Sequence, residues 1–298
     1  GSVDCIVAKG LSNISMTGTG VIEGNGLVWW EHRDDFRPRQ VYFDKVSSAL
    51  IYGLTLQNSP NHVLELYSDN TEVGFVRIRN PSSHAKVPSH NTDAVDVHGS
   101  PFYIHDCDFQ TGDDNIAAHA NDTLVENCYF GTGHGASIGS LGGGTYLQNI
   151  TFRNIVFDGS VAAARIKSRP GTTGFLRDVV YQNLTLSNVQ TAIVVDMFYS
   201  DDGEGGGDTS LDIDNISFVD IRGEGIGAPG YFNCQSTAPC HDLHLDHIDI
   251  APASVDVGAA TQDQKDIAPS ASSSFAFQCE NAYGDADDVV PSSCLRHK

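Results

Sequence analysis

The segment IHDCDF at residues 104–109 returns as VENCYF at residues 125–130. Both copies alternate apolar with polar residues, and both place a cysteine and a phenylalanine at the same two positions. The copies begin about 21 residues apart, and recurrence at such an interval is typical of stacked repeats rather than of a closed globule. This pair of segments therefore predicts a solenoid.

Segments of the same kind recur along the rest of the chain. They are rich in β-branched residues and alternate in polarity, which is typical of strands with one buried face. They are residues 13–17, 49–56, 73–78, 149–157, 179–186, 215–221 and 243–250. No long helical periodicity separates them. The sequence therefore predicts an all-β fold, a right-handed parallel β-helix in which each turn of chain adds one strand to each of several parallel sheets.

A single domain is expected over residues 1–298. A solenoid can lengthen without enlarging its core, so a chain of 298 residues does not by itself require two domains. Glycine and serine are spread through the predicted turns rather than gathered in a linker.

The chain is strongly acidic, with a formal net charge of −21. A nucleic-acid partner is not expected, because a phosphate backbone demands clustered lysine and arginine. No segment is long enough to span a membrane. The acidity can simply serve solubility, and it would repel a polyanionic substrate unless a local cationic spot overrides the global field.

Seven cysteines indicate an oxidising compartment. Cys234–Cys240 and Cys279–Cys294 are predicted to be disulfides, because each pair is close in sequence. Cys107 and Cys128 should stack on neighbouring coils about 5 Å apart, either as a disulfide or as free thiols. Cys5 is left over.

Five Asn-x-Ser/Thr sequons add to the indication of a secreted protein. The candidate glycosylation sites are Asn13, Asn121, Asn149, Asn183 and Asn215. Several lie at strand edges, where the asparagine could instead belong to a stacked internal ladder. The chain starts at Gly1 without an apolar leader, so a signal peptide is expected to have been removed or never included.

Three short polar motifs follow one another at about the repeat interval, residues 91–93 (NTD), 112–114 (GDD) and 133–135 (GHG), and a fourth, residues 165–167 (RIK), comes later in the chain. In a solenoid whose repeat matches that interval, side chains one repeat apart stack on one wall. Three carboxylates, a histidine and a basic pair on one wall suggest a site that cuts an acidic sugar polymer.

The acids Asp93, Asp113 and Asp114 are the candidate catalytic groups. Adjacent carboxylates repel, and the pKa of one of them rises; Gly112 could supply the bend that lets both reach one cleft. A Gly-Asp-Asp alone is more often a plain turn, but Asp93 one coil earlier favours chemistry. Inverting glycosidases need one protonated carboxyl to donate a proton and one carboxylate to activate water.

The remaining motif residues suit sugar binding. His134 could be an ordinary turn histidine, but the flanking glycines, including Gly135, leave room for a sugar ring to approach. Arg165 and Lys167 should point outward together, either as a surface salt-bridged pair or as a clamp for a sugar carboxylate. Tyr199 could stack on sugar or simply end its strand.

These motifs resemble those of the polygalacturonases of glycoside hydrolase family 28. The resemblance extends upstream to residues 58–60 (NSP) and downstream to residues 279–281 (CEN) with Cys294, so it covers most of the chain. It implies a secreted right-handed β-helix without a cofactor. It also implies metal-free, inverting hydrolysis of α-1,4 linkages between galacturonic acids in polygalacturonan (pectin).

Roles for individual residues follow from that resemblance. It implies that Asp113 is the general acid, that Asp93 and Asp114 activate water, and that His134 tunes the acid. The substrate-binding residues that it implies are Asn91, Gly135, Arg165, Lys167 and Tyr199.

Two positions depart from the family pattern. Asn115 stands where many relatives have a cysteine, which removes a possible disulfide but no catalytic group. His119 stands where relatives often have lysine or asparagine, which leaves the subsite preference open.

The expected protein is an extracellular or cell-wall monomer whose partner is polygalacturonate. Internal (endo) attack is slightly favoured, because no large insertion is apparent. The alternatives are an exo-polygalacturonase, a rhamnogalacturonan or xylogalacturonan hydrolase, and a β-helix pectin lyase. A catalytically inactive wall-binding protein on the same scaffold is a further alternative.

Overall fold

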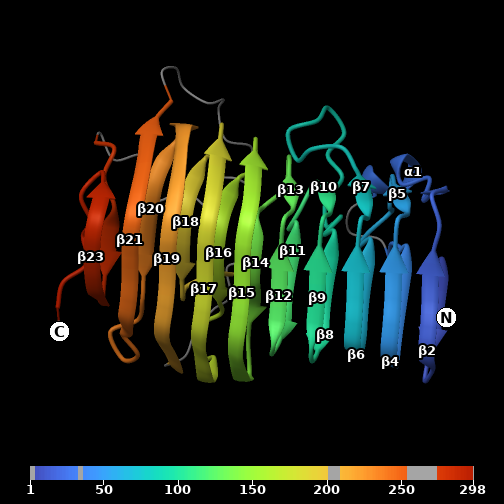
Figure 1. The fold of residues 1–298 in the computed structure, drawn as a ribbon, viewed down its shortest axis with the longest axis horizontal. Helices are drawn as coiled ribbons and strands as arrows, with labels where there is room; N and C mark the ends of the chain where they lie inside the picture. The colour runs from blue at the N-terminus through green and yellow to red at the C-terminus, as the bar shows by residue number, and fades with distance from the viewer. Residues whose placement is uncertain (1–3, 33–35, 201–208, 254–273, 298) are drawn as a thin grey trace. The chain divides into compact units, whose positions relative to one another are not determined.

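The computed structural model describes residues 4–32, 36–200, 209–253 and 274–297, and the regular secondary structure of these residues is β-strand apart from one short helix (Figure 1). The chain divides into two compact units, residues 1–136 and 137–298. Each unit is a stack of parallel strands, as the repeats predict. One domain over residues 1–298 stays a prediction.

Unit 1 consists of three parallel sheets. Its elements are β1 (Ile6–Lys9), β2 (Ser12–Thr17), β3 (Val21–Glu23), α1 (Leu27–Trp30), β4 (Val41–Tyr52), β5 (Thr55–Gln57), β6 (Leu64–Gly74), β7 (Arg77–Arg79), β8 (Val95–Gly99), β9 (Phe102–His105), β10 (Asp108–Gln110), β11 (Ile116–Ala120), β12 (Thr123–Glu126) and β13 (Tyr129–Phe130). One sheet runs β1-β4-β6-β8-β11, the second β2-β4-β6-β9-β12 and the third β3-β5-β7-β10-β13. The long strands β4 and β6 bend and serve two sheets.

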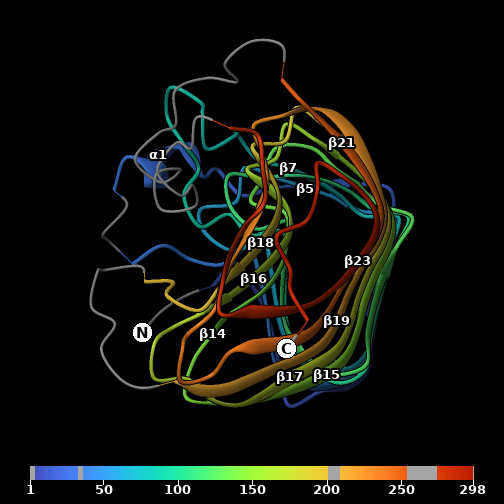
Figure 2. The same ribbon diagram turned by 90° about the vertical axis from the view of Figure 1, so that its left-hand side faces the viewer.

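Unit 2 has longer strands in the same parallel arrangement. Its strands are β14 (Ala136–Leu141), β15 (Gly144–Asp158), β16 (Ala162–Ser168), β17 (Thr173–Ser187), β18 (Thr191–Asp196), β19 (Ser210–Ile226), β20 (Ala228–Asn233), β21 (Cys240–Pro252), β22 (Gln278–Glu280) and β23 (Ala282–Val290). β15, β17, β19, β21 and β23 form one parallel series, and β16, β18, β20 and β22 form another. Figure 2 shows β15, β17 and β19 curving together.

Left-handed residues make the bends, and they recur in register. Asn149, Asp178, Asn215 and Asp242 occupy corresponding positions in β15, β17, β19 and β21, with φ of 59°, 55°, 52° and 49°. Asparagine and aspartate tolerate this conformation better than other residues with a side chain. The left-handed backbone conformation at the bend therefore explains why Asn or Asp recurs once per coil.

Two of the sequon asparagines, Asn183 and Asn215, donate a hydrogen bond to a polar side chain of the neighbouring coil. The Asn183 amide donates to Asn154 Oδ1 at 2.8 Å, and the Asn215 amide donates to Asp178 Oδ1 at 2.7 Å. Asn149, Asn183 and Asn215 are exposed. The stacking expected of such asparagines is therefore found, but on the outside of the coils rather than inside. Glycosylation of the five sequons stays a prediction.

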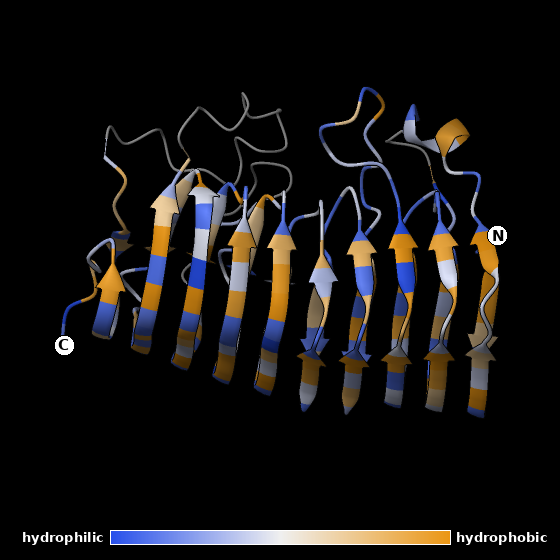
Figure 3. Cartoon of the chain, turned by 45° about the horizontal axis from the view of Figure 1, so that its top comes forward, coloured by the Kyte–Doolittle hydropathy of each residue, from blue (hydrophilic) through white to orange (hydrophobic). Residues whose placement is uncertain are grey.

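The interior of each unit is filled by side chains that stack from coil to coil. In unit 1 the repeat residues Phe109 and Phe130 stack with ring centroids 5.6 Å apart. In unit 2 Tyr181 stacks between Phe152 and Phe218, at 4.8 and 5.4 Å. Figure 3 shows the hydrophobic and hydrophilic bands that alternate along the strands. Each coil thus contributes one inward-facing side chain at each such position, and the stacked side chains form the core.

Four of the cysteines form two disulfides, and the other three are free thiols. Cys234–Cys240 and Cys279–Cys294 are disulfides, which confirms both predicted pairs. Cys107 and Cys128 are buried free thiols, so the free-thiol alternative holds for them, and Cys5 is free and exposed. Within the described part of the chain, no helix has the length and apolar character needed to cross a membrane.

Candidate active site

The predicted acids of unit 1 come together where two successive coils stack. Asp93 precedes β8, and Asp113 and Asp114 precede β11. The Ala94 amide donates to the Asp114 carbonyl at 2.9 Å, which holds the two segments in register. The Asn91 amide donates to Asp113 Oδ2 at 3.3 Å. Residues about 20 positions apart in sequence are therefore neighbours in space.

The next coil brings His134 to the same group. Its amide donates to the Asp113 carbonyl at 2.8 Å, and its Nδ1 lies 3.0 Å from Asp113 Oδ1. Side-chain ligand atoms of Asp113, Asp114 and His134 all lie within 4.8 Å of one another. The structure thus assembles the cluster that the motif spacing predicts.

Gly112 is needed for close packing. A Cβ at this position would lie 2.2 Å from the Ser89 carbonyl oxygen and 2.3 Å from its hydroxyl. The Gly112 amide also donates to Thr92 Oγ1 at 3.0 Å. The glycine therefore lets the segment with the paired acids press against the segment that carries Asn91 and Asp93.

Asn115 has a structural role that its sequence position did not reveal. Its side chain is buried; Oδ1 accepts from the Gly135 amide at 3.0 Å, and the amide group donates to the Thr132 carbonyl at 3.2 Å. A Cβ at Gly133 would lie 2.4 Å from this side chain. Asn115 therefore anchors the glycine-rich loop that presents His134. The clue in the sequence is a polar residue at the start of an otherwise apolar strand.

The acids are more buried than the sequence suggests. Asp93 and Asp114 are only 7% and 1% exposed, while Asp113 is half-buried. Of the three acids, Asp113 is therefore the most accessible to solvent.

Burial makes the ionisation of Asp93 costly. It raises the pKa of Asp93 well above the usual range, and the nearby carboxylates of Asp113 and Asp96 raise it further. His62 opposes this rise, because its positive charge stabilises the Asp93 carboxylate. Burial and repulsion between neighbouring carboxylates thus act together on Asp93.

Sequence reasoning missed His62, Glu65 and Asp96, which lie on the other side of Asp93. Glu65 and Asp96 are buried and His62 is partly buried. A lone carboxylate within the otherwise apolar run of residues 94–97 (AVDV) is the one signal that could have identified Asp96. No comparable sequence pattern identifies His62.

His119, which departs from the family pattern, extends a stack of rings. It stacks on His98 with centroids 4.8 Å apart, and His98 stacks on Tyr67 at 4.1 Å. These rings come from β11, β8 and β6, one from each coil.

Unit 2 brings Arg165, Lys167 and Tyr199 together. The Arg165 guanidinium lies 5.4 Å from the centroid of the Tyr199 ring, and Lys167 Nζ lies 5.0 Å from it. The three side chains therefore lie on one face, while Ile166 between the two cations is fully buried. Arg165 and Lys167 are 3% and 6% exposed, so they are not a solvated surface pair.

Asp196 is a further residue of this part of unit 2 that the sequence did not single out. It pairs in register with Lys167, and its Oδ1 accepts from the Asn233 amide at 3.1 Å. Burial raises the pKa of Asp196, whereas Arg165 works in the opposite direction. This part of unit 2 thus holds two buried cations, Arg165 and Lys167, and the carboxyl group of Asp196.

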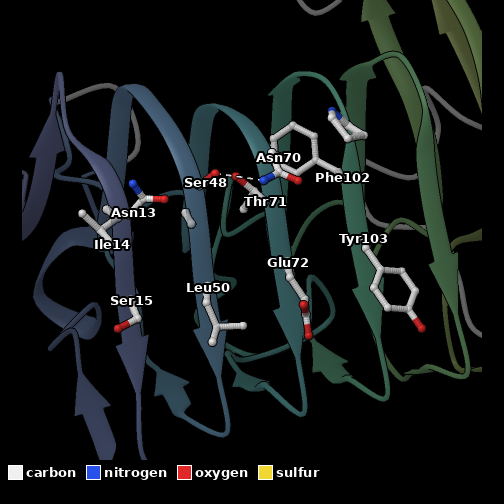
Figure 4. Close-up of a pocket in the computed structure, with 12 residues that line it drawn as sticks. Asn13, Ile14, Ser15, Ser48, Leu50, Asn70, Thr71, Glu72, Phe102 and Tyr103 are labelled. Carbon is white, nitrogen blue, oxygen red and sulfur yellow. Dashed lines mark hydrogen bonds between the residues drawn. The ribbon is translucent and has the colours of Figure 1, made fainter.

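A separate pocket of unit 1 has a volume of about 510 Å³ and lies at the bend of β2, β4, β6 and β9 (Figure 4). Asn13, Asn70, Glu72, Leu50 and Tyr103 are among the residues that line it. None of the predicted catalytic residues lines this pocket. A concave sheet corner explains its presence without any chemistry.

Stacked parallel coils define a parallel β-helix protein, with an acid cluster and a histidine in unit 1 and two buried cations beside a tyrosine in unit 2. Residues 1–271 match Glycosyl hydrolases family 28. The chain belongs to this family, and the predicted right-handed parallel β-helix is confirmed.

Similar proteins carry polygalacturonase names. A probable polygalacturonase of Arabidopsis thaliana is 32% identical over 87% of this chain and 58% of its own length. An exopolygalacturonase of Rhizopus delemar is 33% identical over 82% of this chain and 66% of its own length. The chain thus spans less than two thirds of these relatives.

Among solved structures, a polygalacturonase from Erwinia carotovora is similar, with a TM-score of 0.73 and 26% identity. The similarity covers 86% of this chain and 73% of that one.

Proposed function

We propose that the protein is a polygalacturonase that hydrolyses α-1,4-galacturonosyl linkages of polygalacturonan (pectin) with inversion. The observation that carries this proposal is the gathering of Asp93, Asp113, Asp114 and His134 from three successive coils. Membership of glycosyl hydrolase family 28 and the names of the relatives support it.

In the proposed reaction, water attacks the anomeric carbon and the bond from that carbon to the glycosidic oxygen breaks. The Asp113 carboxyl gives its proton to the departing oxygen, while Asp93 and Asp114 take the proton of the attacking water. His134, 3.0 Å from Asp113 Oδ1, orients the acid. The carboxyl groups supply both proton transfers, so the proposed mechanism needs no metal or other cofactor.

Recognition of the galacturonate carboxylate is assigned to Arg165 and Lys167, with Tyr199 against the sugar. Two cations that lie together on one face match the charge of a sugar carboxylate, and arginine can bind such a group through two parallel hydrogen bonds. Asn91 and Gly135 are proposed to contact the sugar from the side of the acid cluster.

We propose internal attack on the polymer. Release from the chain end is the second candidate, because the relative from Rhizopus delemar is named an exopolygalacturonase. A product profile separates the two: mixed oligomers support internal attack, and monomer alone contradicts it. We further propose a secreted monomer, and its two disulfides support an oxidising compartment.

The test is the release of reducing ends from polygalacturonate by the wild type and by Asp113→Asn. The substitution removes the proton donor, so turnover is expected to fall by a factor of about 10² to 10⁴. Asp69→Asn, which makes the same chemical change at an exposed residue, should leave activity unchanged.

Other outcomes would contradict the proposal. Full activity of Asp113→Asn would exclude its assigned role, and unsaturated products absorbing in the ultraviolet would indicate a lyase. No release of reducing ends by the wild type would favour an inactive wall-binding protein. Activity should peak at mildly acidic pH, where one acid is protonated and the others are not; a rate still rising above neutral pH would contradict proton sharing.

A further inference from the structure

His62 lies between carboxylates from two coils of unit 1. Its Nδ1 is 3.1 Å from Glu65 Oε2 and 2.9 Å from Asp96 Oδ2. Its Nε2 is 3.7 Å from Asp93 Oδ1. Both ring nitrogens therefore face carboxylate oxygens, and the contacts of Nδ1 are within hydrogen-bond distance.

We propose that His62 is a positioning residue for the reaction: its imidazolium orients the Asp93 carboxyl group beside the acid pair of the next coil and offsets part of the negative charge around it. This inference rests on the proposed function, in which Asp93 takes a proton from the attacking water.

The charges around His62 favour its protonated form. Burial alone would lower the pKa of His62, but Asp96 and Asp93 raise it well above its ordinary value, and the hydrogen bonds to Asp96 and Glu65 add to the rise. Beyond Glu65 lies Arg39, with Nη1 3.0 Å from Glu65 Oε1. The His62 ring therefore faces three carboxylates, and the cation Arg39 is paired with one of them, Glu65.

Asp93 needs such a cation. Burial, Asp113 and Asp96 raise the pKa of Asp93, and Asp114 adds to the rise. These groups all favour the protonated acid, which cannot accept a proton from water. His62 acts in the opposite direction, so removing its charge should raise the pKa of Asp93 further.

Unit 1 offers a matched control in His105. Its Nδ1 lies 2.7 Å from Asp106 Oδ2 and its Nε2 lies 3.1 Å from Glu72 Oε1. His105 is thus also held between two carboxylates, but on β9, and neither of its partners is one of the proposed catalytic acids. A histidine that only supports the fold should behave like His105.

The first experiment compares the pH dependence of kcat on polygalacturonate in the wild type, His62→Gln and His105→Gln. Removing a cation this close to Asp93 should move the acidic limb of the profile upward by about one to three pH units. KM should change little, because His62 is assigned no contact with substrate. His105→Gln should leave the limb in place. An unmoved limb in His62→Gln, or an equal movement in His105→Gln, would overturn the proposal.

A charge-restoring variant separates charge from shape. His62→Lys keeps a cation and should move the acidic limb less than His62→Gln does. Equal movement in the two variants would contradict a role based on charge.

The second experiment needs no substrate and no variant of His62. Nitrogen NMR of ¹⁵N-histidine-labelled protein should show His62 doubly protonated at about pH 7, above the ordinary histidine pKa of about 6.5. In Asp93→Asn the pKa of His62 should fall. A neutral His62 at about pH 6 would overturn the inference even if the enzyme is active. A protein without hydrolase activity would refute the proposed function while this titration still reports the charge of His62.

Discussion

At the scale of single residues, buried polar side chains hold in place the segments that carry the proposed catalytic residues. The Asn115 side chain has no exposed surface and connects the start of β11 to the Gly135 amide. Arg37 is also buried; it donates to the Pro60 carbonyl at 3.0 Å and to Asn91 Oδ1 at 2.5 Å. Such hydrogen bonds contribute little net free energy to stability. Removing one partner is nevertheless destabilising, because the other partner stays buried without a hydrogen bond.

We therefore expect Asn115→Ala to be destabilising. It leaves the Gly135 amide without its acceptor, at a cost of roughly 1 to 3 kcal/mol, and it loosens the loop that holds His134. Urea unfolding measures the loss, with Gln57→Ala, which removes a side-chain amide outside the buried interior, as the control. Equal midpoints for the two variants would contradict an anchoring role.

The ionisation of Glu65 gives a second prediction at this scale. Burial alone would raise its pKa, but His62 and Arg39 lower it to about 2. Since the folded-state pKa is lower than the unfolded value of about 4.3, Glu65 stabilises the fold above that unfolded value. This contribution is lost as the pH falls towards 2.

The melting temperature followed between about pH 5 and pH 2 tests this contribution. Glu65→Gln should lower the melting temperature near pH 5 and reduce its dependence on pH in this range. A variant that keeps the full pH dependence would show that other acids cause the loss.

At the scale of strands, neighbouring coils approach so closely that some positions exclude every side chain. Gly174 on β17 has a φ of +106°, and a Cβ there would lie 1.8 Å from the Thr145 carbonyl oxygen of β15. Both the backbone conformation and the contact therefore demand glycine.

Gly174→Ala should cost roughly 3 kcal/mol, because strain and overpacking act together. Gly142→Ala is the matched control, since a Cβ there would meet no atom closer than 4.0 Å. Chemical denaturation of both variants gives the comparison. A Gly174→Ala protein as stable as Gly142→Ala would mean that the strands can move apart cheaply.

At the scale of the whole molecule, the formal charge of −21 opposes a polyanionic substrate. Long-range repulsion depends on the total charge, whereas binding of a sugar carboxylate depends on close contacts such as those proposed for Arg165 and Lys167. Salt screens distant charges more strongly than partly buried close pairs.

Added salt is therefore expected to lower KM for long polygalacturonate. Raising the ionic strength from about 0.01 to about 0.1 M shortens the Debye length from about 30 to about 10 Å. A galacturonate trimer carries less charge and should respond less. A KM that rises with salt for the polymer would show that the local cations, rather than the net charge, control association.

Much of the site was predictable, because repeat spacing turns sequence distance into spatial proximity. Asp93, Asp113 and His134 lie about one repeat apart, so knowledge of the coil length was enough to predict their contact. Asn115 and His62 were not predictable in the same way. Their roles depend on which backbone groups and carboxylates the neighbouring coils bring to them, and no periodic pattern marks those positions.

The sequence alone predicted the parallel coils, both disulfides and the grouping of Asp93, Asp113, Asp114 and His134. These properties depend on period, side-chain type and separation along the chain. Only the tertiary structure decided how deeply Asp93 and Asp114 are buried and which cation compensates them. Burial and electrostatic coupling depend on distances of a few ångströms between coils, and these distances follow from packing rather than from spacing along the chain.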